Sequence, residues 1–412
     1  MKKKIIVFTI FLIIILGGYF TLYHKDKELK FIPRNADAVI LLDTKNATRQ
    51  YLLSFLSHPS EWFKGKGKKE NTISIQESGV KIPDFLQIFH LENTKTSEWY
   101  SVVELDNKQK FLEYLKQEKF INKGKDLFQK DNFFIKIEYE NCILGTSSAA
   151  FENIIHLFLA FPDRTNFSSE DFIDNSLGSI SFVSKGKIQN FSINLNEDNI
   201  QIKNNKYAEK FSSILSKLEK TKSFAEVELD QKNIKKLTSF WDKTFADSSQ
   251  INFVKSSIEL EQVSDTIITY GYDDNFNEIE KKSVQKNTQP DYVIDFTSLN
   301  NEKTEKYFLN KKWINAQKQF TAIPFQPNLI EKTGMGFQIK STRKSIGLSL
   351  KLNENYIFVR NNQLLSSSLK TLSTKEKKIL SDLDYVFYGN NNSDYYIKLQ
   401  FKKSELPLIL RW

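Results

Sequence analysis

The sequence of 412 residues contains only one cysteine and four histidines. A single thiol excludes an intramolecular disulfide, so the fold must be held together by packing. One free thiol is compatible with a bacterial envelope protein but not with a disulfide-stapled secreted protein. Cys142 lies in a strand-like run and is interpreted as a small buried apolar residue.

The histidines also give no sign of a metal centre. No two of them have metal-ligand spacing, and neither H-E-x-x-H nor C-x-x-C occurs; they are His24, His58, His90 and His156. We therefore expect no metal and no cofactor. His156, between two apolar neighbours, is predicted to pack on an apolar helix face.

Catalytic motifs are equally sparse, because G-x-S-x-G, the P-loop and G-x-G-x-x-G are absent. The penicillin-binding type of serine acyl-transferase uses S-x-x-K, S-x-N and K-T-G, and three matching tripeptides or tetrapeptides occur in that order at Ser184–Lys187, Ser298–Asn300 and Lys332–Gly334. However, Ser184 sits beside Gly186 in a strand-turn context, not at the start of a helix. We therefore expect no catalytic residue, and a serine acyl-transferase or hydrolase is the least favoured alternative.

The first 27 residues are predicted to form a signal anchor. Lys2, Lys3 and Lys4 precede an uncharged apolar run, residues 5–23, whose 19 residues would span about 28 Å as a helix. The lysines predict a single-pass protein of the bacterial inner membrane whose remaining chain is periplasmic or extracytoplasmic. A cleaved signal peptide with an apolar core at 5–16 is the alternative, although no A-x-A-like site follows.

The net charge of +9 does not indicate nucleic-acid binding. Three of the lysines are Lys2, Lys3 and Lys4 before the apolar run, and the other cationic and acidic side chains are interspersed along the chain. That pattern is typical of a solvated surface of mixed charge. Hydrophobic residues form 40% of the sequence, enough for packed cores.

A strand followed by a helix recurs along the chain. Apolar strand-like runs change to helical spacing in five places: 38–43 before 44–56, 100–106 before 107–118, 224–230 before 231–243, 292–296 before 298–310, and 395–399 before 404–410. Asp43, Asp106 and Asp230 stand where a strand ends and are predicted helix N-caps. Two hairpins, 133–145 and 347–359, precede predicted helices at 148–161 and 362–372.

These matches are collinear, which is the pattern left by a duplication with later insertions. The corresponding pairs are Asp43 with Asp230, Leu105 with Phe296, Asn141 with Asn355, and Phe182 with Phe387. The alternative to a duplication is that any α+β chain repeats strand–helix steps. The predicted fold is α+β: an N-terminal transmembrane helix, then two related modules (31–203 and 222–412) of antiparallel sheet with helices on one face, joined by a helical linker at 204–221. Residues 251–260 are predicted to be a strand, and residues 273–291 are predicted to be a polar loop.

The start of the first module resembles a known kind of protein. Residues 32–39 read Ile-Pro-Arg-Asn-Ala-Asp-Ala-Val, an I-P-x-x-A-x-A-hydrophobic pattern. It is similar to membrane-anchored bacterial envelope proteins of the domain-of-unknown-function type. The resemblance implies location and architecture but no chemistry and no functional residue.

The functional expectation is a non-enzymatic, membrane-tethered envelope protein that binds a protein or cell-wall partner, with a structural or assembly factor of an envelope complex as the alternative. The basic loop at 64–69 is interpreted as solvated rather than as a phosphate or headgroup contact. The tryptophans are expected to fill two cores rather than to bind partners; they are Trp62, Trp99, Trp241, Trp313 and Trp412.

Overall fold

The computed structural model describes residues 19, 21–62, 73–160, 167–204, 208–239, 242–323, 328–362, 364, 374–391 and 394–411. Strands make up 44% of the chain and helices 25%, so the fold is mostly β with a large antiparallel sheet, and the predicted α+β class is wrong. Most of the predicted transmembrane run, 5–23, lies outside the described residues. Among the helices that are described, none combines the length and the apolar character needed to cross a bilayer.

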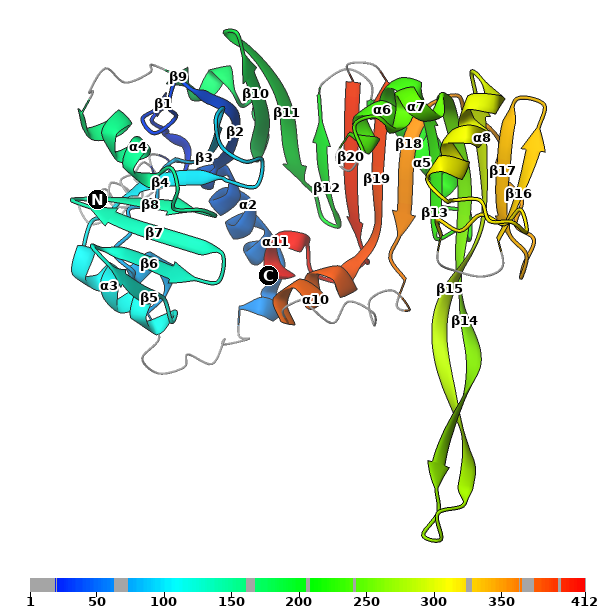
Figure 1. Cartoon of the computed structure of the whole chain (residues 1–412). Helices are drawn as coiled ribbons and strands as arrows, with labels where there is room; N and C mark the ends of the chain where they lie inside the picture. The colour runs from blue at the N-terminus through cyan, green and yellow to red at the C-terminus, as the bar shows by residue number, and fades with distance from the viewer. Residues whose placement is uncertain are drawn as a thin grey trace, which may run out of the picture. The chain divides into compact units, whose positions relative to one another are not determined.

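The chain divides into two compact units (Figure 1). The first contains residues 1–205 together with 404–412, and the second contains residues 206–403.

The first unit is built on antiparallel strands in the spatial order β12-β11-β10-β2-β3-β4-β8-β7-β6-β5. Its strands are β1 (Glu28–Leu29), β2 (Ala36–Asp43), β3 (Phe85–Leu91), β4 (Tyr100–Glu104), β5 (Ile121–Gly124), β6 (Leu127–Lys130), β7 (Phe133–Glu138), β8 (Asn141–Gly145), β9 (Phe167–Ser168), β10 (Gly178–Ser184), β11 (Lys187–Leu195) and β12 (Asn199–Lys203). Its helices are α2 (Thr44–Ser57), α3 (Lys108–Gln117), α4 (Phe151–Ile155) and α11 (Leu408–Arg411), with short helical turns η1 (Pro59–Glu61), η2 (Ile75–Glu77), η3 (His156–Ala160) and η4 (Ser169–Asp171).

Helices cover both faces of this sheet. Successive residues of a strand point to opposite faces. Val102 belongs to the core that contains Ile154 of α4, whereas its neighbour Val103 belongs to the core that contains Phe111 and Leu115 of α3. The expectation of helices on one face is therefore wrong for this unit.

The second unit is also an antiparallel sheet, in the order β20-β19-β18-β13-β14-β15-β17-β16. Its strands are β13 (Ala225–Asp230), β14 (Ile251–Tyr272), β15 (Glu278–Ser298), β16 (Asn328–Thr333), β17 (Gly336–Ser341), β18 (Asn355–Arg360), β19 (Leu383–Asn391) and β20 (Asp394–Phe401). Its helices are α5 (Ala208–Leu218), α6 (Gln231–Thr238), α7 (Phe245–Ser249), α8 (Asn301–Asn310) and α10 (Thr374–Asp382).

Both faces of this sheet are again covered. Phe358 of β18 packs with Phe211 of α5, whereas the adjacent Ile357 packs against the core that contains Ile234 of α6 and Phe308 of α8. The expectation of helices on one face of the sheet is therefore wrong for the second unit as well.

Eight strands follow the same order in both units, and the first unit has β5 and β6 in addition. In each, the first strand (β2 or β13) lies between two neighbours, β10 and β3 or β18 and β14. The chain then reaches β4 or β15, which pairs with the second strand of the hairpin β7–β8 or β16–β17. Asp43 and Asp230 occupy equivalent places, but the predicted match of Asn141 with Asn355 is wrong, because β8 corresponds to β17 and not to β18.

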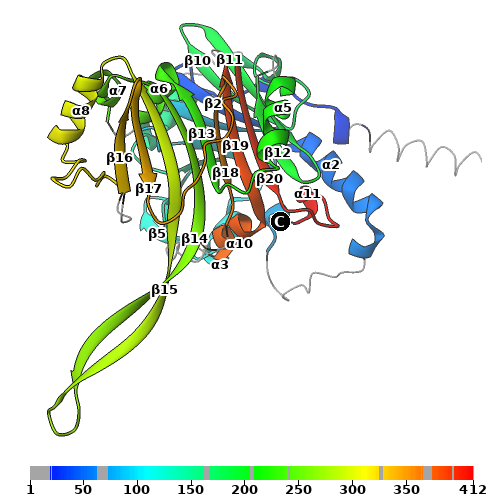
Figure 2. The ribbon, with the colours of Figure 1, turned by 90° about the vertical axis from the view of Figure 1, so that its right-hand side faces the viewer.

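The feature that departs most from this common plan is the hairpin β14–β15. Its two strands extend well beyond the rest of the second unit's sheet and twist about each other as a two-stranded ribbon (Figures 1 and 2). This hairpin includes the segment 273–291 that the sequence predicted to be a polar loop, so that prediction is wrong.

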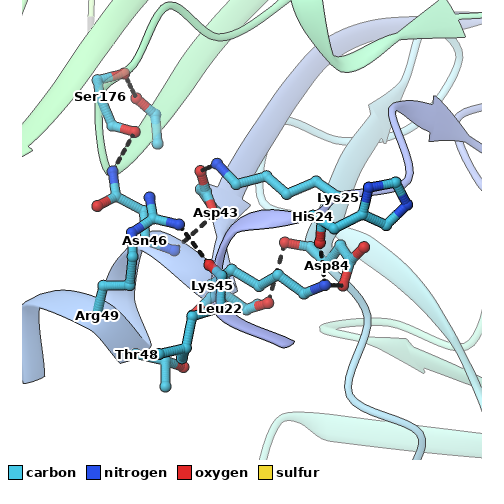
Figure 3. Close-up of polar contacts among 12 residues, drawn as sticks. Leu22, His24, Lys25, Asp43, Lys45, Asn46, Thr48, Arg49, Asp84 and Ser176 are labelled. Atoms are coloured by element: carbon cyan, nitrogen blue, oxygen red, sulfur yellow. Dashed lines mark hydrogen bonds and ion pairs between the residues drawn. The ribbon is translucent and has the colours of Figure 1, made fainter. Parts of the chain in front are cut away.

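The segment that follows residue 18 is fastened to the first unit where β2 ends and α2 begins (Figure 3). Lys25 forms an ion pair with Asp43, whose carboxylate also caps α2 by accepting the Asn46 amide at 2.8 Å. Arg49 of α2 donates to the carbonyl of Leu22 at 2.6 Å. Residues 22–25 are therefore held directly against β2 and α2 of the first unit.

Candidate functional site

Cys142, His90 and His156 do not form a common site. Cys142 is fully buried in β8, as predicted, and burial raises the pKa of its thiol. His90 is buried and contacts Asp37 at 2.6 Å, whereas His156 begins η3 with an exposed side chain, so its predicted packing role is wrong. Within the described ranges, no group of His, Cys, Asp and Glu has the arrangement of a metal site.

The three serine and lysine motifs are also separate. Ser184 ends β10 at a hairpin turn of the first unit. The other two motifs lie in the second unit, where the Ser298 hydroxyl contacts the Thr304 hydroxyl at 2.6 Å and Lys332 is 3.2 Å from Glu305. The lysine ammonium is thus occupied by an ion pair on α8.

The tryptophans differ in how far they are buried. Trp313 packs among the aromatic rings of the second unit, as expected, and Trp99 lies 5.5 Å from the ring of His90. Trp62 is 47% exposed and so does not fill a core. The remaining two, at 241 and 412, and the basic loop at 64–69 lie outside the described residues.

A hollow of about 330 Å³ with a mixed polar and apolar lining opens in the first unit beside β4 and β8. Carboxylates and lysines share its lining, and Lys81 forms an ion pair with Glu104 at 2.5 Å. A second hollow of about 450 Å³ is almost wholly apolar and is lined by residues such as Ile40, Ile88 and Leu144. Neither hollow presents a nucleophile with a base beside it.

The strongest candidate is the part of β14–β15 that leaves the sheet, which we call the arm (residues 259–292). β14 pairs with β13 only as far as Ile258, and β15 pairs with β17 only from Val293 onward. Between these points the two strands pair with each other, from Glu259 with Asp291 to Tyr272 with Glu278. At about 3.3 Å per residue, β14 carries the arm about 40 Å past the sheet.

Charged side chains hold the root of the arm. Asp291 is fully buried, and Arg343 donates to it from Nε at 3.2 Å. Arg343 also lies 3.6 Å from Glu261, and the next residue, Lys344, lies 2.6 Å from Glu259. One dipeptide therefore ties both strands together at the place where they leave the sheet.

The strand before the arm is fixed by a buried ion pair. Lys255 of β14 lies 3.0 Å from Glu228 of β13, and the two side chains are 6% and 1% exposed. The Glu228 carboxylate also accepts the backbone amides of Leu352 and Asn353 at 3.0 and 2.7 Å. These contacts make the base of the arm a rigid mount, because a buried carboxylate with three donors has a single favourable position.

A polar turn orders the tip of the arm. Asp273 accepts the backbone amides of Asn275 and Asn277 at 2.9 and 2.8 Å. Hydrogen bonds from the Asn277 side chain and backbone hold the pKa of Asp273 below its usual value. Phe276, with φ of 62°, is 86% exposed at the end of this turn. A bulky residue in the left-handed region is uncommon.

Large apolar side chains continue along the arm without burial. Their exposed fractions are 40% or more, and they are Ile267, Ile268, Tyr270, Tyr272, Phe276 and Val284. Cross-strand pairing places Val284, Ile268, Tyr270 and Tyr272 on one face in succession, since Thr266 pairs with Val284 and every second residue shares a face. Clustered exposed apolar side chains of this kind mark interaction sites.

The sequence prediction divides the arm into two unrelated pieces, a strand at 251–260 and a loop at 273–291. The run Thr-Ile-Ile-Thr-Tyr-Gly-Tyr at 266–272 is rich in β-forming residues and could have extended the strand prediction.

No protein-family model, no curated protein and no solved structure matches this chain.

Proposed function

We propose that this chain is a non-catalytic binding protein whose arm holds a protein partner. The observation that carries the proposal is a rigidly mounted ribbon, about 40 Å long, whose apolar side chains face solvent. A two-stranded hairpin gains little stability alone, so its length is unexplained by folding. The apolar residues at its tip gain burial when a partner covers them.

The charge of the arm favours a protein over a lipid surface. Residues 265–280 contain five acidic side chains and no basic one: Asp265, Asp273, Asp274, Glu278 and Glu280. Anionic lipid headgroups attract basic segments and repel acidic ones. A protein surface that combines an apolar pocket with positive charge matches the tip better.

The location of this binding role stays a prediction from the sequence. Residues 1–27 favour attachment to the bacterial inner membrane through residues 5–23, with the rest of the chain on the extracytoplasmic side, where a protein or cell-wall partner would be met. Fractionation of cells and protease accessibility of the full chain test that prediction separately from the binding role.

The experiment is photo-crosslinking from the arm in living cells that make the full-length chain. A benzophenone amino acid replaces Phe276 or Tyr272, and the matched control replaces Tyr139, an aromatic residue that is also exposed (76%) at a turn with positive φ. We expect one discrete protein adduct from both arm positions and none from Tyr139. Adducts equal to those of Tyr139, or adducts with lipid alone, would overturn the proposal.

A further inference from the structure

The arm has two free edges. Beyond Ile258 and before Val293, neither β14 nor β15 has a third strand beside it among the described residues. Each strand of a two-stranded ribbon directs half of its backbone amides and carbonyls away from its partner. Such edges are templates for pairing with another chain unless charges, proline or bulges protect them.

Only one of the two edges carries that protection. The free run of β15 contains charged side chains and, near the root of the arm, Pro290, which has no amide hydrogen. The charged residues are Glu278, Glu280, Lys281, Lys282 and Lys286. On β14 the segment Thr266–Tyr272 has neither charge nor proline over seven consecutive residues. Its composition, uncharged and strongly β-forming, is the type that adds strands readily.

The chemistry of the neighbouring residues selects the strand that would be added. The uncharged segment is bounded by Asp265 on one side and by Asp273 and Asp274 on the other. An antiparallel pair of two such arms would bring Asp265 of one copy toward Asp273 of the other, and like charges opposite each other are destabilising. A strand with lysine or arginine at its ends meets the opposite charge at both ends.

We infer that the outer edge of β14, residues 266–272, accepts an extended basic segment of a partner protein as a third strand of the arm. This inference rests on the proposed function and adds its mode of binding and the chemistry of the partner. Backbone hydrogen bonds supply the affinity, while Ile268, Tyr270 and Tyr272 contact alternate side chains of the added strand on one face. The rigid root lets the edge stay extended before binding, which lowers the entropy cost.

The first test uses synthetic peptides and the full-length protein. Two fluorescent peptides share a seven-residue Val/Thr core and differ only in flanking residues, two lysines or two glutamates at each end. We expect the lysine peptide to bind at least about tenfold more tightly at low salt, with the difference shrinking as salt is added. Equal binding of both peptides would overturn the charge assignment.

Backbone methylation separates strand addition from side-chain contact. Two further lysine-flanked peptides carry N-methyl groups on alternate amides, one set in each phase. An added strand uses the amides of only one phase toward β14, so one peptide should lose binding by about tenfold or more and the other should retain it. Equal affinities for the two phases would overturn strand addition.

Proline variants locate the edge on the protein. Ile267→Pro and Ile268→Pro remove successive amides of β14, so one of them removes an outward donor; Ser283→Pro and Lys282→Pro, at the cross-strand partners, disturb the ribbon equally but spare the β14 amides. We expect a β14 variant to abolish peptide binding while both β15 variants retain it. Four equal losses would overturn the assignment to β14.

The outcome is distinguishable from failure of the proposed function. If Phe276 crosslinks to a protein in cells but no peptide binds, strand addition is wrong and the protein-binding arm stands. If neither occurs, both proposals fall. A concentration-dependent dimer that disappears in the Ile268→Pro variant would replace the basic partner with a second copy of this chain.

Discussion

The buried ion pair at the mount of the arm gives a prediction with a large expected effect. Lys255 and Glu228 are removed from water, and Glu228 also accepts two backbone amides. Glu228→Gln keeps the size of the side chain and an acceptor oxygen but removes the charge. An unpaired ammonium group then remains buried, and breaking a buried pair in this way costs about 3–5 kcal/mol.

Hydrogen exchange followed by mass spectrometry measures this loss of stability separately for the second unit. A loss of about 3–5 kcal/mol should accelerate exchange of protected β13 amides between about 100-fold and several thousandfold, whereas β2 of the first unit should be unchanged. Adding Lys255→Met to Glu228→Gln removes the unpaired charge and should restore about 1–3 kcal/mol. The reasoning is refuted if Glu228→Gln changes β13 exchange by less than about fivefold, or if the second substitution adds to the damage.

Three further predictions concern packing and pH. Gly336→Ala should destabilise the second unit by about 3 kcal/mol or more in denaturant unfolding, because an added Cβ would lie 1.8 Å from a carbonyl oxygen of β15; Gly334→Ala, with no atom within 4 Å, should be neutral. Burial lowers the pKa of His90, but hydrogen bonds to Asp37 and to the Lys95 carbonyl, together with the charges of Asp37 and Glu98, outweigh it and raise the pKa above 6.5. This stabilisation is complete below pH 6.5 and is lost as pH rises through the folded pKa, and Asp37→Asn should lower the pKa measured by NMR titration. Burial raises the pKa of Tyr292 to about 12. Its contribution to stability is therefore complete below pH 10 and declines between pH 10 and 12. A Tyr292→Phe variant should lack that part of the alkaline decline in thermal stability.

The sequence predicted the elements whose side chains face a core. The strand–helix steps at β2–α2, β4–α3, β13–α6 and β15–α8 are confirmed. Asp43 and Asp230 are N-caps as predicted, but Asn107 rather than Asp106 caps α3. These signals are local: an apolar alternation against a core and a carboxylate or amide before the first helical turn.

The sequence does not predict elements that have no core on either side. The arm has solvent on both faces, and its segment 273–291 shows no hydrophobic alternation, so that segment is predicted to be a loop. The predicted hairpin at 347–359 failed for the opposite reason. Residues 347–352 alternate like a strand but form none, since the Leu352 amide bonds the buried carboxylate of Glu228 instead of a neighbouring strand. The predicted helix at 362–372 lies mostly outside the described residues.

The helices near the ends of the modules were placed only roughly. The predicted helix at 148–161 is a short α4 followed by a π-helical turn, and 404–410 is helical only from Leu408. Which face a helix covers depends on contacts between residues far apart in the chain, and local sequence patterns do not reveal those contacts.

The last described residues of the chain have a consequence for the order in which the protein is made. α11 belongs to the first unit: Leu408 is buried, its amide donates to the Glu197 carbonyl at 2.8 Å, and Arg411 pairs with Asp198. The ribosome must synthesise the entire second unit before it reaches α11, which takes about 10–40 s at typical rates. The first unit therefore lacks α11 throughout the synthesis of the second unit and its arm.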